Sequence, residues 1–341
     1  MNGQSSIKEF LFLSPSYRVA EGWIFDWAKM PMEKCICLPK RTARFIKWPV
    51  QKTRMKKFSR RKTLFTIGSM AALGPIWAVN ERFAKPKVRI GACDWSIGKA
   101  SDPSALALAR EIGLDGVQVS LGNVANDMHL RQKSMQETYL KAAKTYKVKI
   151  AGLAIGELNR VPYKSAPETE AWVSDSIDVA KALGCKNVLL AFFSAGDLRN
   201  DPAGKQEVIR RLKKVAPKAE AANVVLGIES WLSAEEHLEI LSAVGSSHVK
   251  VYYDLANATK MGYDIFKEIA LLGAENICEI HFKENGQLLG QGKVDFEKVK
   301  VSLDKIGYKG WYIMEGAIPK GMEVLPAYRQ NLNFVSQLMK S

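Results

Sequence analysis

Cysteine and histidine are scarce in this sequence, which has five cysteines and four histidines among 341 residues. Three cysteines, Cys93, Cys185 and Cys278, are dispersed in apolar runs after residue 86, which predicts buried free thiols and not a disulfide framework. Cys35 and Cys37 have no second pair with which to complete a metal site. With 47% apolar and 25% charged residues, the chain is expected to fold around a sizeable hydrophobic core.

Excess basic charge is absent from most of the chain. Residues 1–86 hold 17 lysines and arginines against 5 acidic residues, a net charge of +12. Residues 87–341 hold 33 against 30, a net charge of +3, so the total of +15 belongs mainly to the N-terminal segment. Because this main part has no basic stripe that would neutralise phosphates, we expect no nucleic-acid partner.

The N-terminal segment is typical of an export signal. From Met55 a basic stretch, MKKFSRRK, precedes 14 mostly apolar residues from Thr66 to Val79. That stretch is short for a membrane span, which needs about 20 residues. SRRKTLF resembles the twin-arginine signal S/T-R-R-x-F-L-K, with Thr63 and Leu64 in the places of the usual Phe and Leu. This interpretation, preferred to a general secretory signal or an uncleaved anchor, predicts an exported, periplasmic protein with no stable membrane span after signal removal.

The position of this signal divides the chain. Because a signal normally begins a protein, Met55 is the simplest start, and residues 1–54 are expected to be an untranslated or disordered extension. A genuine 54-residue extension, which would bury the signal, is the alternative. The expected organisation is therefore an extension over 1–54, a signal segment over 55–86 with cleavage near 78–85, and one folded domain over 87–341.

A strand–helix unit recurs through the folded domain. Eight short apolar or β-branched runs are separated by stretches with helical spacing, and their starts lie 25 to 39 residues apart, which suits strand–helix–strand crossovers. The predicted strands are 88–93, 116–120, 148–154, 187–193, 224–229, 249–254, 277–282 and 311–315.

The predicted helices end at a recurring glycine joint. Residues 103–113 begin after Asp102 as a cap and end at Gly113, while 167–183 and 264–272 end before Gly184 and Gly273. Eight such units in about 250 residues favour an α/β single domain, a (β/α)₈ TIM barrel. The rival is a doubly wound open sheet, but no G-x-G-x-x-G motif follows the first strand and no P-loop occurs.

Ionisable residues close the last four predicted strands. They are Glu229 in LGIES, Asp254 in VYYDLAN, His281 in EIHFK and Glu315 in YIMEG. His281 alone would be read as a core imidazole, but the carboxyl ends of barrel strands converge on one site. Because burying three carboxylates without a cation is prohibitive, the pattern predicts one divalent metal. An oxygen-rich set favours Mn²⁺ or Mg²⁺, with Co²⁺ or Zn²⁺ as alternatives.

These motifs resemble the xylose isomerase-like barrel superfamily, in particular sugar isomerases and epimerases related to D-tagatose 3-epimerase and hydroxypyruvate isomerase. The resemblance spans roughly residues 87–338 and includes HFKENGQLLGQGKVDFEKV, which is similar to the family segment H-x-K-D…G-x-G-x-x-D/N-W/F. It implies that the four residues hold one metal and that Glu229 and Glu315 also act as acid and base. The implied reaction moves a proton through an enediolate of a keto-sugar.

The sequence departs from the family in two places. Many relatives have D-x-x-H after the sixth strand, where this chain has Asp254-Leu-Ala-Asn257, and an amide cannot transfer a proton. Epimerases often carry an arginine a few residues after the histidine of the seventh strand, and this chain has Lys283 and Gln287 nearby instead. A lyase or hydratase acting on 3-keto-sugars or glycosides is therefore the alternative, and a non-catalytic sugar-binding barrel the third reading. The endonuclease branch of the superfamily needs a histidine-rich cluster of three metals, and this chain, with four histidines, cannot supply it.

Other polar and aromatic residues fall near strand ends and are candidates for the site wall: Asp94, Trp95, Gln118, Glu157, Phe192, Trp231 and Glu235. The predicted substrate contacts are Trp95, Glu157, Asn257 and Lys283, although aromatic packing and solvated loop charges are the alternatives. Export and the lack of a visible phosphate nest favour a free sugar or glycoside over a sugar phosphate. The oligomeric state, including a homo-oligomer, is left open.

Overall fold

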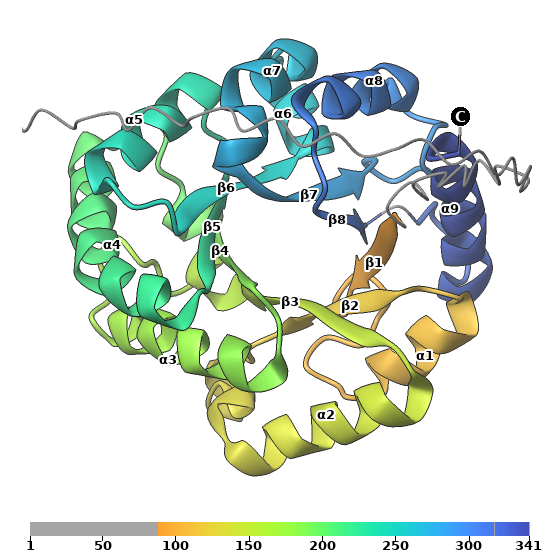
Figure 1. Cartoon of the computed structure of the whole chain (residues 1–341), viewed down its shortest axis with the longest axis horizontal. Coiled ribbons are helices and arrows are strands. Elements are labelled where there is room, and N and C mark those ends of the chain that lie inside the picture. Colours follow the sequence, from red (N-terminus) through yellow and green to blue (C-terminus); the bar gives the residue numbers. More distant parts are fainter. Residues whose placement is uncertain (1–87, 317, 341) are drawn as a thin grey trace, which may run out of the picture. The chain divides into compact units, whose positions relative to one another are not determined.

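Eight parallel strands close into a barrel in a computed structural model that describes residues 88–316 and 318–340 (Figure 1). Each strand pairs with its neighbours in sequence, and β1 also pairs with β8. The strands are β1 Arg89–Cys93, β2 Gly116–Ser120, β3 Lys149–Ile155, β4 Asn187–Phe192, β5 Val225–Ser230, β6 Val249–Asp254, β7 Ile277–Lys283 and β8 Trp311–Glu315. All eight predicted strands are confirmed, each within one residue at either end, and so is the predicted barrel.

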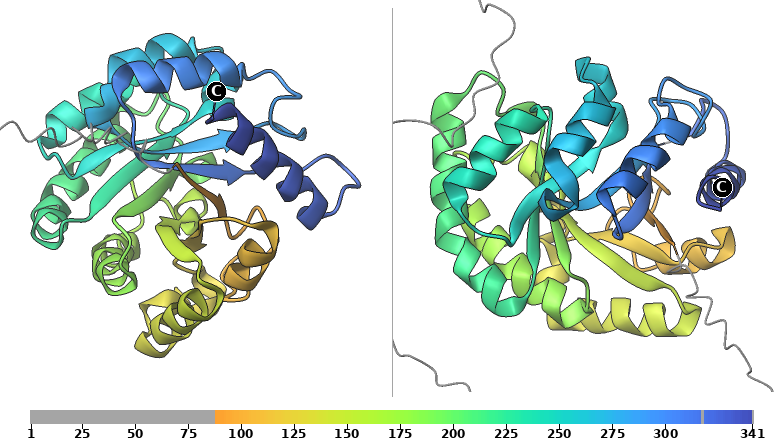
Figure 2. Two further views of the ribbon diagram at one scale, coloured as in Figure 1. Left: turned by 45° about the vertical axis from the view of Figure 1, so that its right-hand side comes forward. Right: turned by 45° about the horizontal axis from the view of Figure 1, so that its top comes forward.

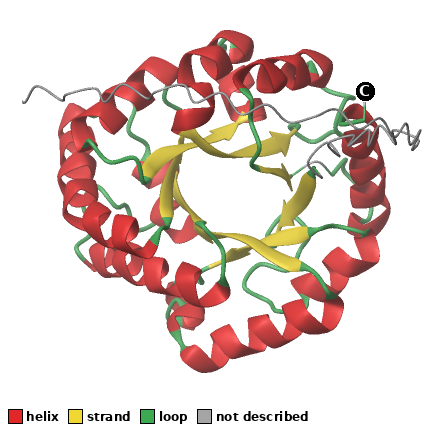
Figure 3. Ribbon diagram, viewed as in Figure 1, coloured by secondary structure: helices red, strands yellow, loops and turns green. Residues whose placement is uncertain are grey.

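Helices form a ring outside the strands, as Figures 2 and 3 show. They are α1 Ala105–Ile112, α2 Lys133–Tyr146, α3 Glu168–Leu183, α4 Pro202–Ala222, α5 Ala234–Val244, α6 Leu255–Met261, α7 Ile265–Asn276, α8 Phe296–Ile306 and α9 Val324–Leu338. Short 3₁₀ helices are η2 Val124–Asn126, η3 His129–Arg131, η4 Gly156–Asn159 and η5 Ser194–Gly196. The last helix, α9, lies beside α1 and completes the ring.

Side-chain alternation along the strands separates two apolar regions. Outward residues such as Ile280 and Phe282 of β7 join the large core between the strands and the helices. Inward residues form two small clusters inside the barrel, one around Trp311 and Ile313 and the other around Tyr252. These clusters fill part of the barrel interior, and in barrels of this kind the site lies at the carboxyl-terminal ends of the strands.

Two of the three predicted glycine joints are confirmed, whereas the joint at Gly273 and the start of α1 differ from the prediction. Gly113 and Gly184 have left-handed backbone conformations that end α1 and α3. Gly273 interrupts the helical geometry of α7, although the chain turns helical again up to Asn276. Asp102 accepts hydrogen bonds from the Ser104 amide and hydroxyl instead of capping α1 directly, and Ser104 precedes the first helical residue without a side-chain cap.

The predicted extension and signal segment, residues 1–54 and 55–86, lie outside the described residues, so both stay predictions. Within residues 88–316 and 318–340, no helix combines the length and apolar character needed to cross a bilayer. Cys93, Cys185 and Cys278 are free thiols as predicted, but only Cys93 and Cys185 of these three are buried, while Cys278 is half-buried.

A buried histidine ties the end of β5 to the first turn of α5. Ser233 caps α5 by accepting a hydrogen bond from the Glu236 amide, and Glu236 bonds back to the Ser233 amide. His237 Nδ1 lies 2.9 Å from the Ser233 carbonyl oxygen, and its Nε2 lies 2.9 Å from Ser230 Oγ. The carbonyl can only accept, so Nδ1 carries the proton and the neutral imidazole fits this place.

His237 is expected to make stability depend on pH. Burial lowers its pKa from 6.5 to about 4, so the unfolded chain binds one more proton between these values. The free energy of unfolding should therefore decrease as the pH falls from 6.5 toward 4, by at most about 1.4 kcal/mol per pH unit from this group. Urea unfolding of the wild type and of His237→Asn across this pH range isolates the contribution of His237 to the free energy of unfolding. Parallel curves for the two proteins would contradict the assignment.

Candidate metal centre and active site

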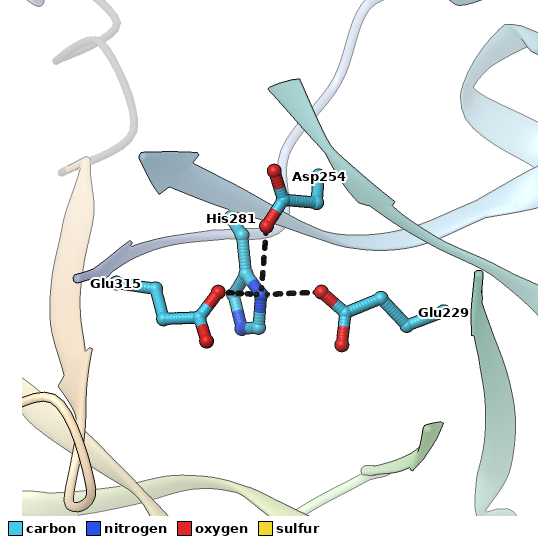
Figure 4. Close-up of side chains that lie close together, drawn as sticks. All are labelled: Glu229, Asp254, His281 and Glu315. Carbon is cyan, nitrogen blue, oxygen red and sulfur yellow. Dashed lines mark hydrogen bonds and ion pairs between the residues drawn. The ribbon is translucent and has the colours of Figure 1, made fainter. Parts of the chain in front are cut away.

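Four ionisable side chains meet at the carboxyl-terminal end of the barrel. Glu229 comes from β5, Asp254 ends β6, His281 lies in β7 and Glu315 ends β8. One donor atom from each lies within 4.8 Å of the other three (Figure 4). The strand register produces this convergence, because Asp254 pairs with His281 across β6 and β7, and Lys283 pairs with Glu315 across β7 and β8.

His281 is at the centre of the cluster. Its Nδ1 atom lies 2.9 Å from Glu229 Oε1, 3.1 Å from Glu315 Oε2 and 3.8 Å from Asp254 Oδ2. Figure 4 shows Glu229 and Glu315 on opposite sides of the imidazole. A small cation among these atoms would therefore have carboxylate oxygens on several sides and one ring nitrogen.

Two further residues contact the carboxylates from the rim. Lys283 Nζ lies 3.0 Å from Glu315 Oε2 and 3.3 Å from Asp254 Oδ2. Trp95 Nε1 donates a hydrogen bond of 2.9 Å to Glu315 Oε1. Both oxygens of Glu315 are thus occupied by donors, which fixes the position of this carboxylate.

The two glutamates have different proton affinities in the metal-free protein. Burial raises the pKa of Glu229 to about 7, and the neighbouring His281 only partly offsets this. Burial acts on Glu315 too, but the positive charges of His281 and Lys283 outweigh it and hold the pKa of Glu315 well below its usual range. Carboxyl pairs whose environments separate their pKa values are typical of acid–base sites.

The donor set fits a divalent cation. Asp254 Oδ2 is buried and accepts no hydrogen bond, while Oδ1 of the same side chain accepts the Asn257 amide at 2.7 Å and caps α6. Its nearest positive charge is Lys283 Nζ, 3.3 Å away, which also serves Glu315 at 3.0 Å. One ammonium group does not balance three buried carboxylates, so a divalent cation would add the missing charge. Three carboxylates and one imidazole suit Mn²⁺ or Mg²⁺, whose ligands are mainly oxygens.

A cavity of about 400 Å³ opens above the cluster. Its lining includes Glu229 and Glu315 and all four predicted substrate contacts: Trp95, Glu157, Asn257 and Lys283. Asp254 and His281 are not among the lining residues and are nearly inaccessible, so the glutamates are the two members of the cluster that a bound molecule reaches first. The volume is within the range of small-molecule sites, about 300–1,000 Å³.

Some of the other candidates have roles outside the cavity. Asp94 accepts hydrogen bonds from the Ser120 amide at 2.8 Å and the Ser101 amide at 3.1 Å, which orders the loops after β1 and β2. Glu235 is exposed on α5. Gln287 lines a separate cavity of about 470 Å³ beside α6, so it does not take the place of an epimerase arginine in this site.

The aromatic wall was predicted one residue out of register. Phe192 points outward and packs in the core against Tyr163, whereas Phe193 lines the cavity and contacts Trp231 edge to face, with ring centroids 5.1 Å apart. The alternation of side chains along β4 could have revealed this difference, because Val188, Leu190 and Phe192 all point outward into the core. Cys93, which no sequence pattern singles out for the site, contacts His281, with Sγ 3.5 Å from Nε2.

Comparisons with known proteins agree with this geometry. The family model described as "Xylose isomerase-like TIM barrel" matches residues 106–338, more than half of the chain. SgbU of Escherichia coli (strain K12), named as a candidate L-ribulose-5-phosphate 3-epimerase, is 26% identical over 251 residues, which are 65% of this chain and 85% of that protein. D-psicose 3-epimerase of Enterocloster bolteae is 26% identical over 134 residues, 36% of this chain and only 44% of the enzyme.

The fold is shared with solved sugar epimerases. One of them is D-psicose 3-epimerase from Clostridium cellulolyticum H10, solved with D-tagatose, which superposes on this chain with a TM-score of 0.64 at 15% sequence identity. The superposition covers 74% of this chain and 99% of the enzyme chain. The names of these relatives agree with the predicted class of sugar isomerase or epimerase. Because the family model covers most of the barrel, the chain belongs to the xylose isomerase-like TIM barrel family.

Proposed function

We propose that this protein is a metal-dependent sugar isomerase or epimerase that moves a proton next to the carbonyl group of a keto-sugar. The observation that carries the proposal is the convergence of Glu229, Asp254, His281 and Glu315 within 4.8 Å below an accessible cavity. Membership of a family whose named relatives include sugar epimerases supports the same class.

The same four residues would hold one divalent ion, for which Mn²⁺ or Mg²⁺ fits the donor set best. When bound, such an ion supplies stabilisation of the negative charge that develops on substrate oxygens. Lys283 contributes a second positive charge, since its Nζ lies 3.0 Å from Glu315 Oε2 and its side chain lines the cavity.

The two glutamates are placed to move the proton. Glu229 and Glu315 lie on opposite sides of His281 and both line the cavity, so a sugar bound between them presents one face to each carboxyl. Proton abstraction by one and return by the other would invert a carbon centre, and this requires groups within hydrogen-bond reach of the reacting carbon. Trp95 and Lys283 hold the Glu315 carboxylate in a fixed position for this step.

The remaining wall residues would orient the sugar. Asn257 and Glu157 line the cavity and can exchange hydrogen bonds with hydroxyl groups. Trp95 and Trp231 offer apolar faces on which a sugar ring can rest. The export signal proposed for residues 55–86 would take the protein to the periplasm, where phosphorylated sugars are scarce. The expected substrate is therefore a free keto-sugar or glycoside.

A lyase or hydratase acting on 3-keto-sugars or glycosides is the second candidate. The observation that favours it is Asn257, which lines the cavity where many relatives have a histidine and which cannot exchange a proton. Removal of a proton by Glu315 or Glu229 would then be followed by loss of a leaving group. The release of an aglycone distinguishes this reaction from epimerisation.

Turnover in deuterium oxide tests the proposal. Full-length protein loaded with Mn²⁺ is incubated with a panel of keto-sugars and 3-keto-glycosides, and the products are examined by NMR and mass spectrometry. The proposal expects solvent deuterium at a sugar carbon, with an epimer or isomer as product. A panel in which sugars bind but neither exchange nor elimination occurs would overturn the proposal in favour of a non-catalytic sugar-binding barrel.

A further inference from the structure

A buried amide lies directly beneath His281. Gln118 Oε1 is 3.0 Å from His281 Nε2, and Cys93 Sγ donates to the same oxygen at 3.2 Å. All three residues are completely inaccessible to solvent. The Nδ1 atom has the three carboxylates as neighbours, whereas Nε2 has Gln118 and Cys93, so each nitrogen of the imidazole has its own partners.

Gln118 is a polar residue at a buried strand position, where an apolar side chain would be expected. It is the middle residue of β2, GVQVS, between the buried Val117 and Val119, and it faces the barrel interior beside Cys93, its partner in the strand register. Its Nε2 atom is buried and makes no hydrogen bond among the residues that the structure describes. The amide is therefore held at its oxygen only, through Cys93 and His281, and a buried polar group of this kind calls for a specific role.

We propose that Gln118 is a positioning residue that fixes the ring tautomer of His281 and thereby strengthens divalent-cation binding; this rests on the metal centre of the proposed function. For Nδ1 to bind a cation, it must present a lone pair to the carboxylate cluster, so the ring proton must be on Nε2. An Nε2–H group can donate to Gln118 Oε1 at the observed 3.0 Å.

Cys93 contacts both the amide and the imidazole. Its thiol donates to Gln118 Oε1 and lies 3.5 Å from His281 Nε2. With the amide reversed, the NH₂ group would face the thiol and the imidazole nitrogen, and Nε2 would have to be the acceptor. The ring proton would then move to Nδ1, where it would point at Glu229 Oε1, 2.9 Å away, and block cation binding. The orientation in the structure, with Oε1 accepting from the thiol and facing Nε2, is the one that the metal centre needs.

The test compares three variants of the full-length protein. Gln118→Met keeps an unbranched side chain but loses the strong acceptor, while Gln118→Glu keeps an acceptor. Gln136→Met is the matched control, because Gln136 donates to the Leu130 carbonyl oxygen at 3.0 Å, outside the metal centre. Mn²⁺ affinity is measured by competition with a chelator, thermal unfolding is recorded for each protein, and ¹⁵N–¹H correlation spectra of the Mg²⁺-loaded proteins report which nitrogen of His281 carries the proton.

We expect Gln118→Met to bind Mn²⁺ about 10–100-fold more weakly, as is typical when a partner of a ligating histidine is removed. Gln118→Glu should keep most of the affinity, Gln136→Met should match the wild type, and the wild-type spectrum should show the proton on Nε2. Wild-type Mn²⁺ affinity in a folded Gln118→Met overturns this inference alone. A proton on Nδ1 in the loaded wild type overturns it too, and also removes His281 from the proposed ligands. Failure of the wild type to bind any divalent ion overturns the proposed function instead.

Discussion

Solvent-deuterium incorporation into a keto-sugar is expected to fall by about 10²–10⁴-fold in Glu315→Gln, the range typical for loss of a general acid or base. The amide keeps the shape of the side chain and can still accept the hydrogen bond from Trp95 Nε1, which lies 2.9 Å from Oε1. It cannot accept a proton from a sugar carbon. The measurement is the initial rate of deuterium exchange at saturating Mn²⁺, followed by NMR.

Two controls separate chemistry from folding and from metal loading. Glu235→Gln makes the same substitution at an exposed position of α5 and should exchange deuterium at the wild-type rate. Elemental analysis of Glu315→Gln shows whether the variant still holds an ion, since Glu315 is also a proposed ligand. Wild-type exchange in a metal-loaded Glu315→Gln would remove this residue from the proton-transfer step.

The second large effect is expected in Asp254→Asn, which should bind Mn²⁺ more than about 100-fold more weakly than the wild type, since loss of an outer-shell partner alone costs about 10–100-fold. Asn is a good helix N-cap, so the substitution preserves the hydrogen bond from the Asn257 amide that begins α6. It removes only the negative charge at Oδ2, 3.8 Å from His281 Nδ1. Calorimetric titration of the metal-free protein measures the affinity.

Asp264→Asn is the matched control for that experiment. Asp264 also caps a helix, accepting from the Phe266 and Lys267 amides at the start of α7, and it is outside the metal centre. It should leave Mn²⁺ affinity unchanged. In Asp254→Asn, the stabilisation that Mn²⁺ gives the wild type on heating should disappear, because an ion stabilises a protein only as far as it binds the native state. Equal thermal shifts in both variants would contradict the role of Asp254.

The fold could be predicted from sequence because its signals are local. Each strand is a short apolar run, and glycines with left-handed backbones, such as Gly113 and Gly184, end the helices before strands. Strand spacing then indicates the crossovers and therefore the barrel. The convergence of Glu229, Asp254, His281 and Glu315 follows from the same pattern, because barrel geometry brings the carboxyl ends of consecutive strands together without any knowledge of side-chain contacts.

Other features could not be predicted from the sequence, because they depend on strand register and on packing across the barrel. Phe193, and not Phe192, lines the cavity because alternation along β4 puts Phe192 in the outer core. The contact of Cys93 and Gln118 with His281 joins strands far apart in sequence, and no spacing rule relates 93 or 118 to 281. Glu235 looked like a strand-end residue, but the chain has already entered α5 at that point.

Anomalous diffraction from crystals grown with Mn²⁺ tests the central claim most directly. The account predicts one strong peak per chain among Glu229, Asp254, His281 and Glu315, within about 2.0–2.6 Å of carboxylate oxygens and close to Nδ1 of the imidazole. A peak at any other position, or no peak at a saturating Mn²⁺ concentration, would contradict it.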